Sequence, residues 1–199
     1  MILTIIVPVY NLDSLLMRAL KSIPVRDDIE ILIVNDASTD RSLEVALEYQ
    51  SQHDNVRIIT NPHNLGLGAT KNVGYDNALG DYINQLDADD YLYTDKYNEI
   101  IAQLDGTDMV YMDLRINNGS VWKVTPQTNH LWCGGTLRFI KRSFLGSHRC
   151  PEVKAGEDWY LNEELQKLPH TDKYTGIIGY HYNFPREGSL CDLRNRGLL

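Results

Sequence analysis

The sequence is poor in the residues that would mark a disulfide-stapled or zinc-binding protein. Its 199 residues include three cysteines, Cys133, Cys150 and Cys191, an odd number without a CxxC pair. This pattern argues against a disulfide framework and against a zinc site, and it favours a reducing compartment.

Positive charge is also scarce. The chain has 19 Lys and Arg against 27 Asp and Glu, which gives a formal net charge of -8. Because nucleic-acid binders usually carry a clustered basic surface, we expect no nucleic-acid partner. A polyanionic small ligand is still compatible with this balance where a metal ion supplies positive charge.

No apolar run is long enough to cross a bilayer. The opening "MILTIIVPVY" has no basic leader and no cleavage site, is interrupted by Pro8, and reaches Asn11 too soon. We therefore expect a cytoplasmic protein. The ending "LRNRGLL" mixes basic and apolar residues, which leaves peripheral docking at a membrane surface open.

The first half of the chain alternates strand and helix patterns. Strands are expected at "LTIIVPVY", "IEILIVNDAS", "NVRIIT" and "DYINQL", with helices between them, one of which opens at Ser38. This alternation predicts an α/β fold with a parallel sheet. Ligands bind such sheets at the carboxyl ends of the strands, where this chain places Tyr10–Asn11, Asn35–Asp36, Asn61 to Asn64, and Asp87 to Asp90.

The pattern is looser after Asp90. A helix is expected over 95–104, and "DMVYMDLRI" and "SVWKVT" predict two strands around an Asn-Gly hairpin turn. "GEDWYLNEELQKL" predicts a helix with acids in its first turn, and "GIIGYHYNF" a last strand. "TLRFIKRSFL" does not distinguish helix from strand.

Three aspartates crowd together in "NQLDADDYLY". Because side chains alternate along a strand, Asp87 and Asp89 point the same way. Carboxylates of this kind bind Mg²⁺ or Mn²⁺ together with substrate phosphates. A turn or capping role is the alternative. The glycine-rich "NLGLGATKNVG" is no dinucleotide motif, because Lys71 occupies the third glycine position of GxGxxG.

Four segments, "TIIVPVYN", "EILIVNDASTD", "NLGLGATKNVGYDNALGDYINQLDADD" and "AGEDWYLNEEL", resemble in this order the motifs of family 2 glycosyltransferases. The resemblance covers roughly residues 3–188. It implies one GT-A domain over 1–199, with a Rossmann-like, mostly parallel central sheet flanked by helices. Residues 1–92 would bind the nucleotide sugar, and 93–199 would form a small acceptor-side half carrying the catalytic base.

The resemblance also implies a donor site. Tyr10 would offer its ring to a pyrimidine and Asp36 would accept from a uracil imide N–H, with an Asx turn or helix cap as the alternative for Asp36. Lys71 stands where the family usually has an arginine, and a solvated lysine is the alternative. The implied donor-binding residues are Pro8, Val9, Tyr10, Asn11, Asp36, Gly68, Lys71, Asp87, Ala88, Arg186 and Ser189.

The metal, Mn²⁺ or Mg²⁺, would be held by Asp89 with Asp87. His181 would be a third ligand as in some members, although a lone strand histidine is more often structural. Arg186 and Ser189 would close over the diphosphate, although Tyr182–Asn183 departs from the family's Tyr-Arg.

In the family's mechanism a general base takes the proton of the acceptor hydroxyl. Asp158 would be that base and Glu157 would orient the acceptor; the alternative is that both acids complement a helix N-terminus. Trp132 and Trp159 would form an acceptor platform or pack in the core.

These residues predict a metal-dependent, inverting glycosyltransferase of glycan or cell-surface polysaccharide synthesis. It would transfer a hexose or N-acetylhexosamine from a nucleotide-diphosphate sugar, foremost a UDP-sugar, to a hydroxyl of a glycan or lipid-linked glycan. One alternative is a sugar-nucleotidyltransferase, although "VPVYNLDSLL" lacks that class's glycine-rich, arginine-bearing loop. The other is a non-catalytic nucleotide-sugar-binding module, against which Asp87, Asp89 and Asp158 together speak.

Overall fold

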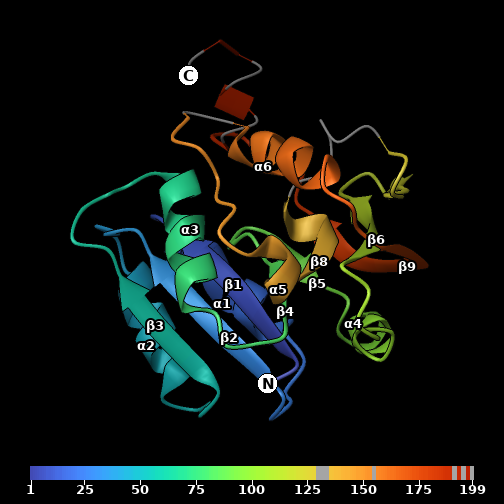
Figure 1. The fold of residues 1–199 in the computed structure, drawn as a ribbon. Coiled ribbons are helices and arrows are strands. Elements are labelled where there is room, and N and C mark those ends of the chain that lie inside the picture. Colours follow the sequence, from blue (N-terminus) through green and yellow to red (C-terminus); the bar gives the residue numbers. More distant parts are fainter. Residues whose placement is uncertain (129–134, 154–155, 190–191, 194–195, 198–199) are drawn as a thin grey trace.

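A computed structural model describes residues 1–128, 135–153, 156–189, 192–193 and 196–197. Within them, nine strands form one mixed sheet with helices on both faces (Figure 1). Trp132, Cys133 and Cys191 lie outside the described residues, so their predicted roles are not addressed by the structure.

The first half follows the predicted alternation. Its elements are β1 (Leu3–Val9), α1 (Asp13–Lys21), β2 (Ile29–Asn35), α2 (Ser42–Gln50), β3 (Val56–Thr60), α3 (Leu67–Asn77) and β4 (Tyr82–Gln85). The four strands are parallel in the order β3-β2-β1-β4. The predicted parallel α/β sheet is therefore confirmed, and its carboxyl ends meet at one edge.

Side chains on alternate positions of β1 and β2 enter two separate apolar clusters. Ile5 and Ile33 pack with α1 and α2, whereas Ile6 and Val34 pack with α3. Every residue of both strands is buried. A strand covered on both faces reads as a continuous apolar run, which is why the sequence shows β-branched runs here rather than alternation.

The second half extends the sheet with mixed directions. Its elements are β5 (Tyr91–Leu92), α4 (Thr94–Ile101), β6 (Met109–Ile116), β7 (Val121–Trp122), η2 (Gly135–Leu137), β8 (Arg138–Lys141), α5 (Arg142–Leu145), α6 (Glu157–Gln166) and β9 (Asp172–Tyr182). β8 is antiparallel to β4 and to β6, and β9 runs parallel to β6 and antiparallel to β5. The predicted Asn-Gly hairpin joins β6 to β7.

Several boundaries differ from the expectation, among them the end of α4, which lies at Ile101 rather than at 104. The ambiguous "TLRFIKRSFL" is divided between η2, β8 and α5, and β9 begins at Asp172 rather than at Gly176. The helix expected to open at Ser38 begins at Ser42 instead. The reason is that residues 38–41 bind the loop after β1: the side chain of Asn11 accepts from the backbone of Thr39 at 2.8 Å.

The helices of the described residues are short. The longest, α3, has 11 residues, and no helix in these ranges is long and apolar enough to cross a bilayer. Figure 1 shows α3 lying across the sheet, with α6 beside its upper end.

The close packing of α3 on β1 generates a prediction about Gly74. A Cβ at Gly74 would lie 2.5 Å from Cγ2 of Ile6 and 2.9 Å from its Cδ1. We expect Gly74→Ala to lower the free energy of unfolding by about 1–3 kcal/mol, as overpacked cores do. Urea denaturation followed by circular dichroism measures the loss.

The control is Ile6→Ala, alone and combined with Gly74→Ala. Ile6→Ala removes Cγ1, Cγ2 and Cδ1, the three carbons that a Cβ at Gly74 would meet. The double variant should therefore lose less free energy of unfolding than the sum of the losses of the two single variants. Additive losses would contradict the packing described for α3.

Candidate active site

Tyr10 and Asn11 follow β1, and Asp36 and Ala37 follow β2, on neighbouring strands. Asn11 and Ala37 adopt left-handed φ angles of 52° and 55°, which non-glycine residues seldom do. The backbone N–H of Asp36 donates to the carbonyl of Val9 at 2.9 Å, and this hydrogen bond joins the two turns. Tyr10 keeps 46% of its surface exposed at this edge.

Asp36 organises the loop that follows β3. Its carboxylate is 3% exposed and accepts from Asn61 Nδ2 at 2.8 Å, from Leu65 N at 2.8 Å and from Gly66 N at 3.0 Å. A carboxylate has about four lone-pair sites, so one remains for a ligand N–H. The structure thus gives Asp36 a loop-anchoring role and leaves its predicted base contact untested.

Lys71 is the point where α3 meets α6. Its Nζ donates to Oε1 of Glu157 at 2.7 Å and to both carboxylate oxygens of Asp158, at 2.9 and 2.8 Å. Lys71 is 1% exposed, which excludes the solvated alternative. Burial alone would lower the pKa of Lys71, but the carboxylates of Asp158 and Glu157 raise it well above its usual value, so the amine stays charged.

Gly68 allows the two helices to approach. A Cβ at this position would lie 3.2 Å from Cβ of Glu157 and 3.2 Å from the carbonyl oxygen of Pro151. The structure therefore gives Gly68 a packing role. Gly68 and Lys71 lie one helical turn apart, and this spacing was the sequence signal that could have placed Lys71 on the buried face.

The three aspartates after β4 have different surroundings. Oδ1 of Asp87 is buried and has no hydrogen-bond partner among the described residues. Burial and the nearby carboxylates raise the pKa of Asp87 to about 7, against the lowering effect of Lys71. Asp89 instead accepts from Nε of Arg186 at 2.7 Å. Ala88 between them is buried.

Asp90 binds the end of β9. It is 1% exposed, and it accepts from the hydroxyl of Tyr180 at 2.6 Å and from Asn183 N at 2.8 Å. Burial raises the pKa of Asp90 well above its usual value, and the charges of Asp87 and Asp89 add to this rise. For Asp90 the structure thus shows a structural role, in line with the turn alternative for these aspartates.

The carboxylates fit a divalent cation that also takes oxygens from a substrate. An unpartnered, buried Oδ1 on Asp87 and an Asp89 carboxylate already paired with a cation both favour positive charge here. Within the described ranges, no three His, Cys, Asp or Glu side chains form a complete ligand set. Mg²⁺ and Mn²⁺ sites of this kind rely on one or two carboxylates and complete their shell with phosphates and water.

His181 has partners on both ring nitrogens. Nδ1 lies 3.0 Å from the hydroxyl of Tyr93 and Nε2 lies 3.0 Å from Oδ1 of Asn117. Burial and the charges of Arg18 and Arg115 lower the pKa of His181, so the ring is neutral at pH 7. To bind a metal, as the resemblance implies, His181 would have to give up one of these contacts.

The segment after β9 reaches back over the aspartates. Arg186 brings its guanidinium to Asp89, and Oγ of Ser189 accepts from Asp192 N at 3.1 Å. Arg18 of α1 donates to the backbone carbonyl of Asp89, a contact that no pattern in the sequence indicates. Two cations from distant parts of the chain therefore meet at one residue of the motif.

The mixed sheet, with four parallel strands and acids at their carboxyl ends, has the architecture of GT-A glycosyltransferases, the class of its structural neighbours. A model of the family "Glycosyl transferase family 2" matches residues 4–159, and the chain belongs to this family. The poly(ribitol-phosphate) beta-glucosyltransferase of Bacillus spizizenii is 37% identical over 209 residues, with 94% of this chain and 33% of that protein covered. The glycosyltransferase GlyA of Streptococcus pneumoniae is 28% identical, with 94% and 31% covered.

Solved structures agree on the fold. Residues 1–349 of Staphylococcus aureus TarS in complex with UDP-GlcNAc align with a TM-score of 0.83 at 22% identity, covering 95% of this chain and 60% of that chain. The Pyrobaculum calidifontis mannosyltransferase PcManGT, solved with GDP-Man and Mn²⁺, aligns with a TM-score of 0.73 at 20% identity, covering 94% and 58%. The chain spans about a third of the length of the curated relatives above.

The raised pKa of Asp87 predicts a pH-dependent stability. An aspartate whose folded pKa is about 7 against an ordinary 3.8 contributes stability at low pH that is lost as the pH rises through 7. In metal-free buffer with EDTA, we expect Asp87→Asn to raise Tm over the wild type by several degrees at pH 8, and by little at pH 4.5. Differential scanning fluorimetry across pH 4.5–8.5 measures both.

The control is Asp81→Asn, which changes an exposed aspartate at the opposite end of β4 and should leave the pH profile unchanged. If Asp87→Asn differs from the wild type by the same Tm at pH 4.5 and at pH 8, the raised pKa of the Asp87 carboxyl is contradicted.

Proposed function

We propose that the protein is an inverting glycosyltransferase that transfers a hexose or N-acetylhexosamine from a nucleotide-diphosphate sugar, foremost a UDP-sugar, to a hydroxyl of a glycan or lipid-linked glycan. Mg²⁺ or Mn²⁺ would be required, and the product would belong to a cell-surface polysaccharide. The observation that carries the proposal is the position of Lys71. Its charge is stabilised by Asp158 and Glu157 of α6 and by Asp87 beyond β4, so acids from both segments act on one ammonium.

The relatives support the substrate class. The Bacillus spizizenii relative is a glucosyltransferase acting on poly(ribitol-phosphate), and TarS binds UDP and UDP-GlcNAc. We carry a nucleotide-sugar donor over from these proteins. The exposed ring of Tyr10 offers a stacking face of roughly 1–3 kcal/mol to the base, and Asp36 has a free lone pair for a base N–H.

Asp158 is the residue that would take the proton from the acceptor hydroxyl. Its side chain is 18% exposed, more than Glu157 at 7% or Lys71 at 1%, so it is the member of this group that substrate can reach. Both oxygens of Asp158 accept from Lys71, and each keeps a further lone pair for the incoming proton. Glu157 and Lys71 would orient it.

The leaving diphosphate needs positive charge on the other side of the site. A divalent cation bound at Asp89 and Asp87 would supply it, by neutralising the charge that develops as the glycosidic bond breaks. Arg186 already reaches Asp89 and would turn to the diphosphate. With Lys71 committed to two carboxylates, Arg186 is the better candidate for a phosphate contact than Lys71.

The general-base assignment predicts the behaviour of Asp158→Asn. The amide keeps the shape of the side chain but cannot take the proton, so donor binding should survive while sugar transfer falls by about 10²–10⁴-fold. Isothermal titration with UDP and Mn²⁺ measures binding. Release of UDP from a panel of nucleotide sugars, with and without candidate acceptors, measures turnover.

The matched control is Glu163→Gln, an exposed acid in the same helix, which should leave both quantities unchanged. Transfer near the wild-type rate in Asp158→Asn would remove Asp158 as the base. If the wild type releases no UDP from any donor and Asp158→Asn still binds UDP as the wild type does, the protein is a non-catalytic binding module and not a transferase.

The metal assignment predicts the behaviour of Asp89→Ala. Manganese-dependent UDP binding should be lost, because a main carboxylate ligand is gone. Tm should stay close to that of the wild type, since the Asp89–Arg186 pair is partly exposed and such pairs contribute about 1 kcal/mol or less. Asp95→Ala, an exposed acid in α4, serves as the control. Normal UDP binding with manganese would show the cluster to be structural.

A further inference from the structure

A row of aromatic rings and guanidinium groups crosses strands β5, β9 and β6 next to the aspartate motif. The cross-strand register pairs His181 with Tyr91 on one side and with Arg115 on the other. Tyr93 follows β5, and Arg18 approaches from α1. We name these five residues, Arg18, Tyr91, His181, Tyr93 and Arg115, the cation–aromatic strip.

The side chains of the strip are stacked on one another. The rings of Tyr91 and His181 are parallel within 9°, with centroids 4.2 Å apart. Cζ of Arg18 lies 5.2 Å from the centroid of Tyr91, and Cζ of Arg115 lies 5.8 Å from that of Tyr93. The hydroxyl of Tyr93 reaches Nδ1 of His181 at 3.0 Å. These contacts hold the five side chains of the strip against one another.

The charge of the strip is opposite to that of the chain. The chain has a formal net charge of -8, yet the strip has two guanidinium groups and no carboxylate. Arg18 donates to the backbone carbonyl of Asp89, and neither guanidinium has a carboxylate partner in the part of the chain that the structure describes. Both are exposed. Exposed cations held over rings are therefore left to attract an anion.

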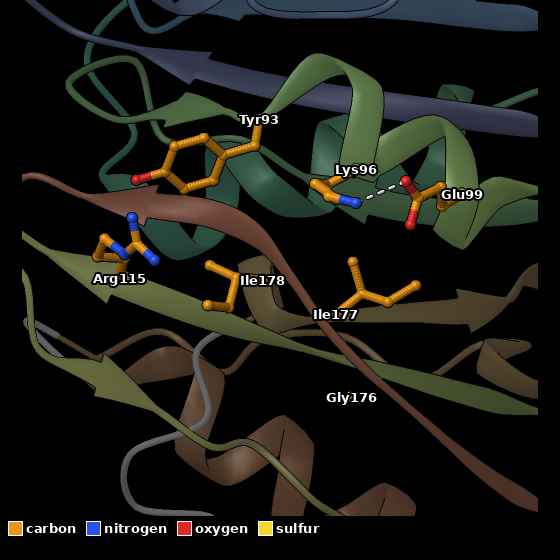
Figure 2. A pocket seen from close by; sticks show the side chains of 7 residues that line it. All are labelled: Tyr93, Lys96, Glu99, Arg115, Gly176, Ile177 and Ile178. Carbon is orange, nitrogen blue, oxygen red and sulfur yellow. Dashed lines mark hydrogen bonds and ion pairs between the residues drawn. The ribbon is translucent and has the colours of Figure 1, made fainter.

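A pocket of about 390 Å³ continues the strip beyond Tyr93 and Arg115. Figure 2 shows Arg115 and Tyr93 at one end of it and Lys96 and Glu99 at the other, with Ile177 and Ile178 between them. Lys96 and Glu99 neutralise each other across 2.7 Å. The pocket thus has an apolar floor and a charged rim, and its unneutralised lining charge is Arg115.

We propose that the cation–aromatic strip and this pocket bind an acidic saccharide, a sugar chain that carries phosphate or carboxylate groups. Ring faces suit the C–H surfaces of sugars, and the guanidinium groups suit the acidic substituents. Arg18 also touches Asp89, so a chain lying on the strip runs up to the proposed donor site. The inference goes beyond the proposed function, to which it adds the class and the path of the acceptor.

The experiment measures binding and requires no turnover. The whole chain, metal-free in EDTA at low ionic strength, is titrated with a galacturonate hexamer, with maltohexaose and with linear polyphosphate of six units. We expect the acidic hexamer to bind at least fivefold more tightly than the neutral one. Arg115→Gln should weaken the acidic hexamer at least fivefold and leave maltohexaose unchanged. Arg41→Gln, an exposed arginine on the far loop before α2, should change neither.

Equal affinity of Arg115→Gln and the wild type for the acidic hexamer would overturn the inference. So would polyphosphate binding that matches the hexamer in both the wild type and Tyr93→Leu, because the strip would then be a plain anion surface. Arg115→Lys provides a second variant that keeps the charge, and it should bind with intermediate affinity. Glucose 6-phosphate and glucuronate, titrated by NMR, then show which acidic group is preferred, and either order supports the inference.

Measurements of hexamer binding and of nucleotide-sugar turnover distinguish failure of the acidic-saccharide proposal from failure of the proposed transferase function. Loss of hexamer binding in Arg115→Gln together with no nucleotide-sugar turnover by the wild type supports the strip and refutes the transferase. Turnover with Arg115→Gln binding the hexamer normally refutes the strip alone.

Discussion

The ammonium group of Lys71 is the interaction on which the site depends. It is buried between α3 and α6 and contacts Glu157 and Asp158 within 2.9 Å. Two carboxylates cannot be held this close beneath the protein surface without a compensating charge, because removing one partner of a buried ion pair costs about 3–5 kcal/mol. The position of α6 against the sheet, and with it the position of Asp158, therefore follows from a residue on a different helix.

The sequence predicts the sheet well because the relevant signal is local. Continuous β-branched runs separated by helical spacing indicated four parallel strands and the edge at which Asp36 and Asp87 meet, and both are found. The same reasoning did not pair Lys71 with the acids 86 and 87 residues away, because side-chain contacts between distant segments leave no periodic trace. It likewise missed Arg18 at Asp89 and the dependence of residues 38–41 on Asn11.

The charges at the sheet edge are the physical reason to expect a cation in the proposed reaction. Four carboxylates, Asp87, Asp89, Glu157 and Asp158, lie near this edge. Lys71 and Arg186 pair with three of them, and a third cation, Arg18, reaches the backbone carbonyl of Asp89. A nucleotide diphosphate brings further negative charge to this group, and like charges disfavour one another's ionised forms. Burial, and after it the charges of Asp89, Asp158 and Glu157, raise the pKa of Asp87 to about 7. A divalent ion bound here would offset this excess of negative charge.

The crowding of three aspartates also has a mechanical consequence. Asp90 binds the hydroxyl of Tyr180 and the backbone of Asn183, at the end of β9, while Asp89 binds Arg186 three residues later. Asp90 therefore fixes the position of Asn183, the first residue after β9. Asp89 beside it pairs with Arg186. A ligand that draws Arg186 away from Asp89 would act on a side chain only three residues beyond the anchor at Asn183. On the proposed function, the like charges are crowded because one short turn would both bind the ligand and hold the segment that follows β9.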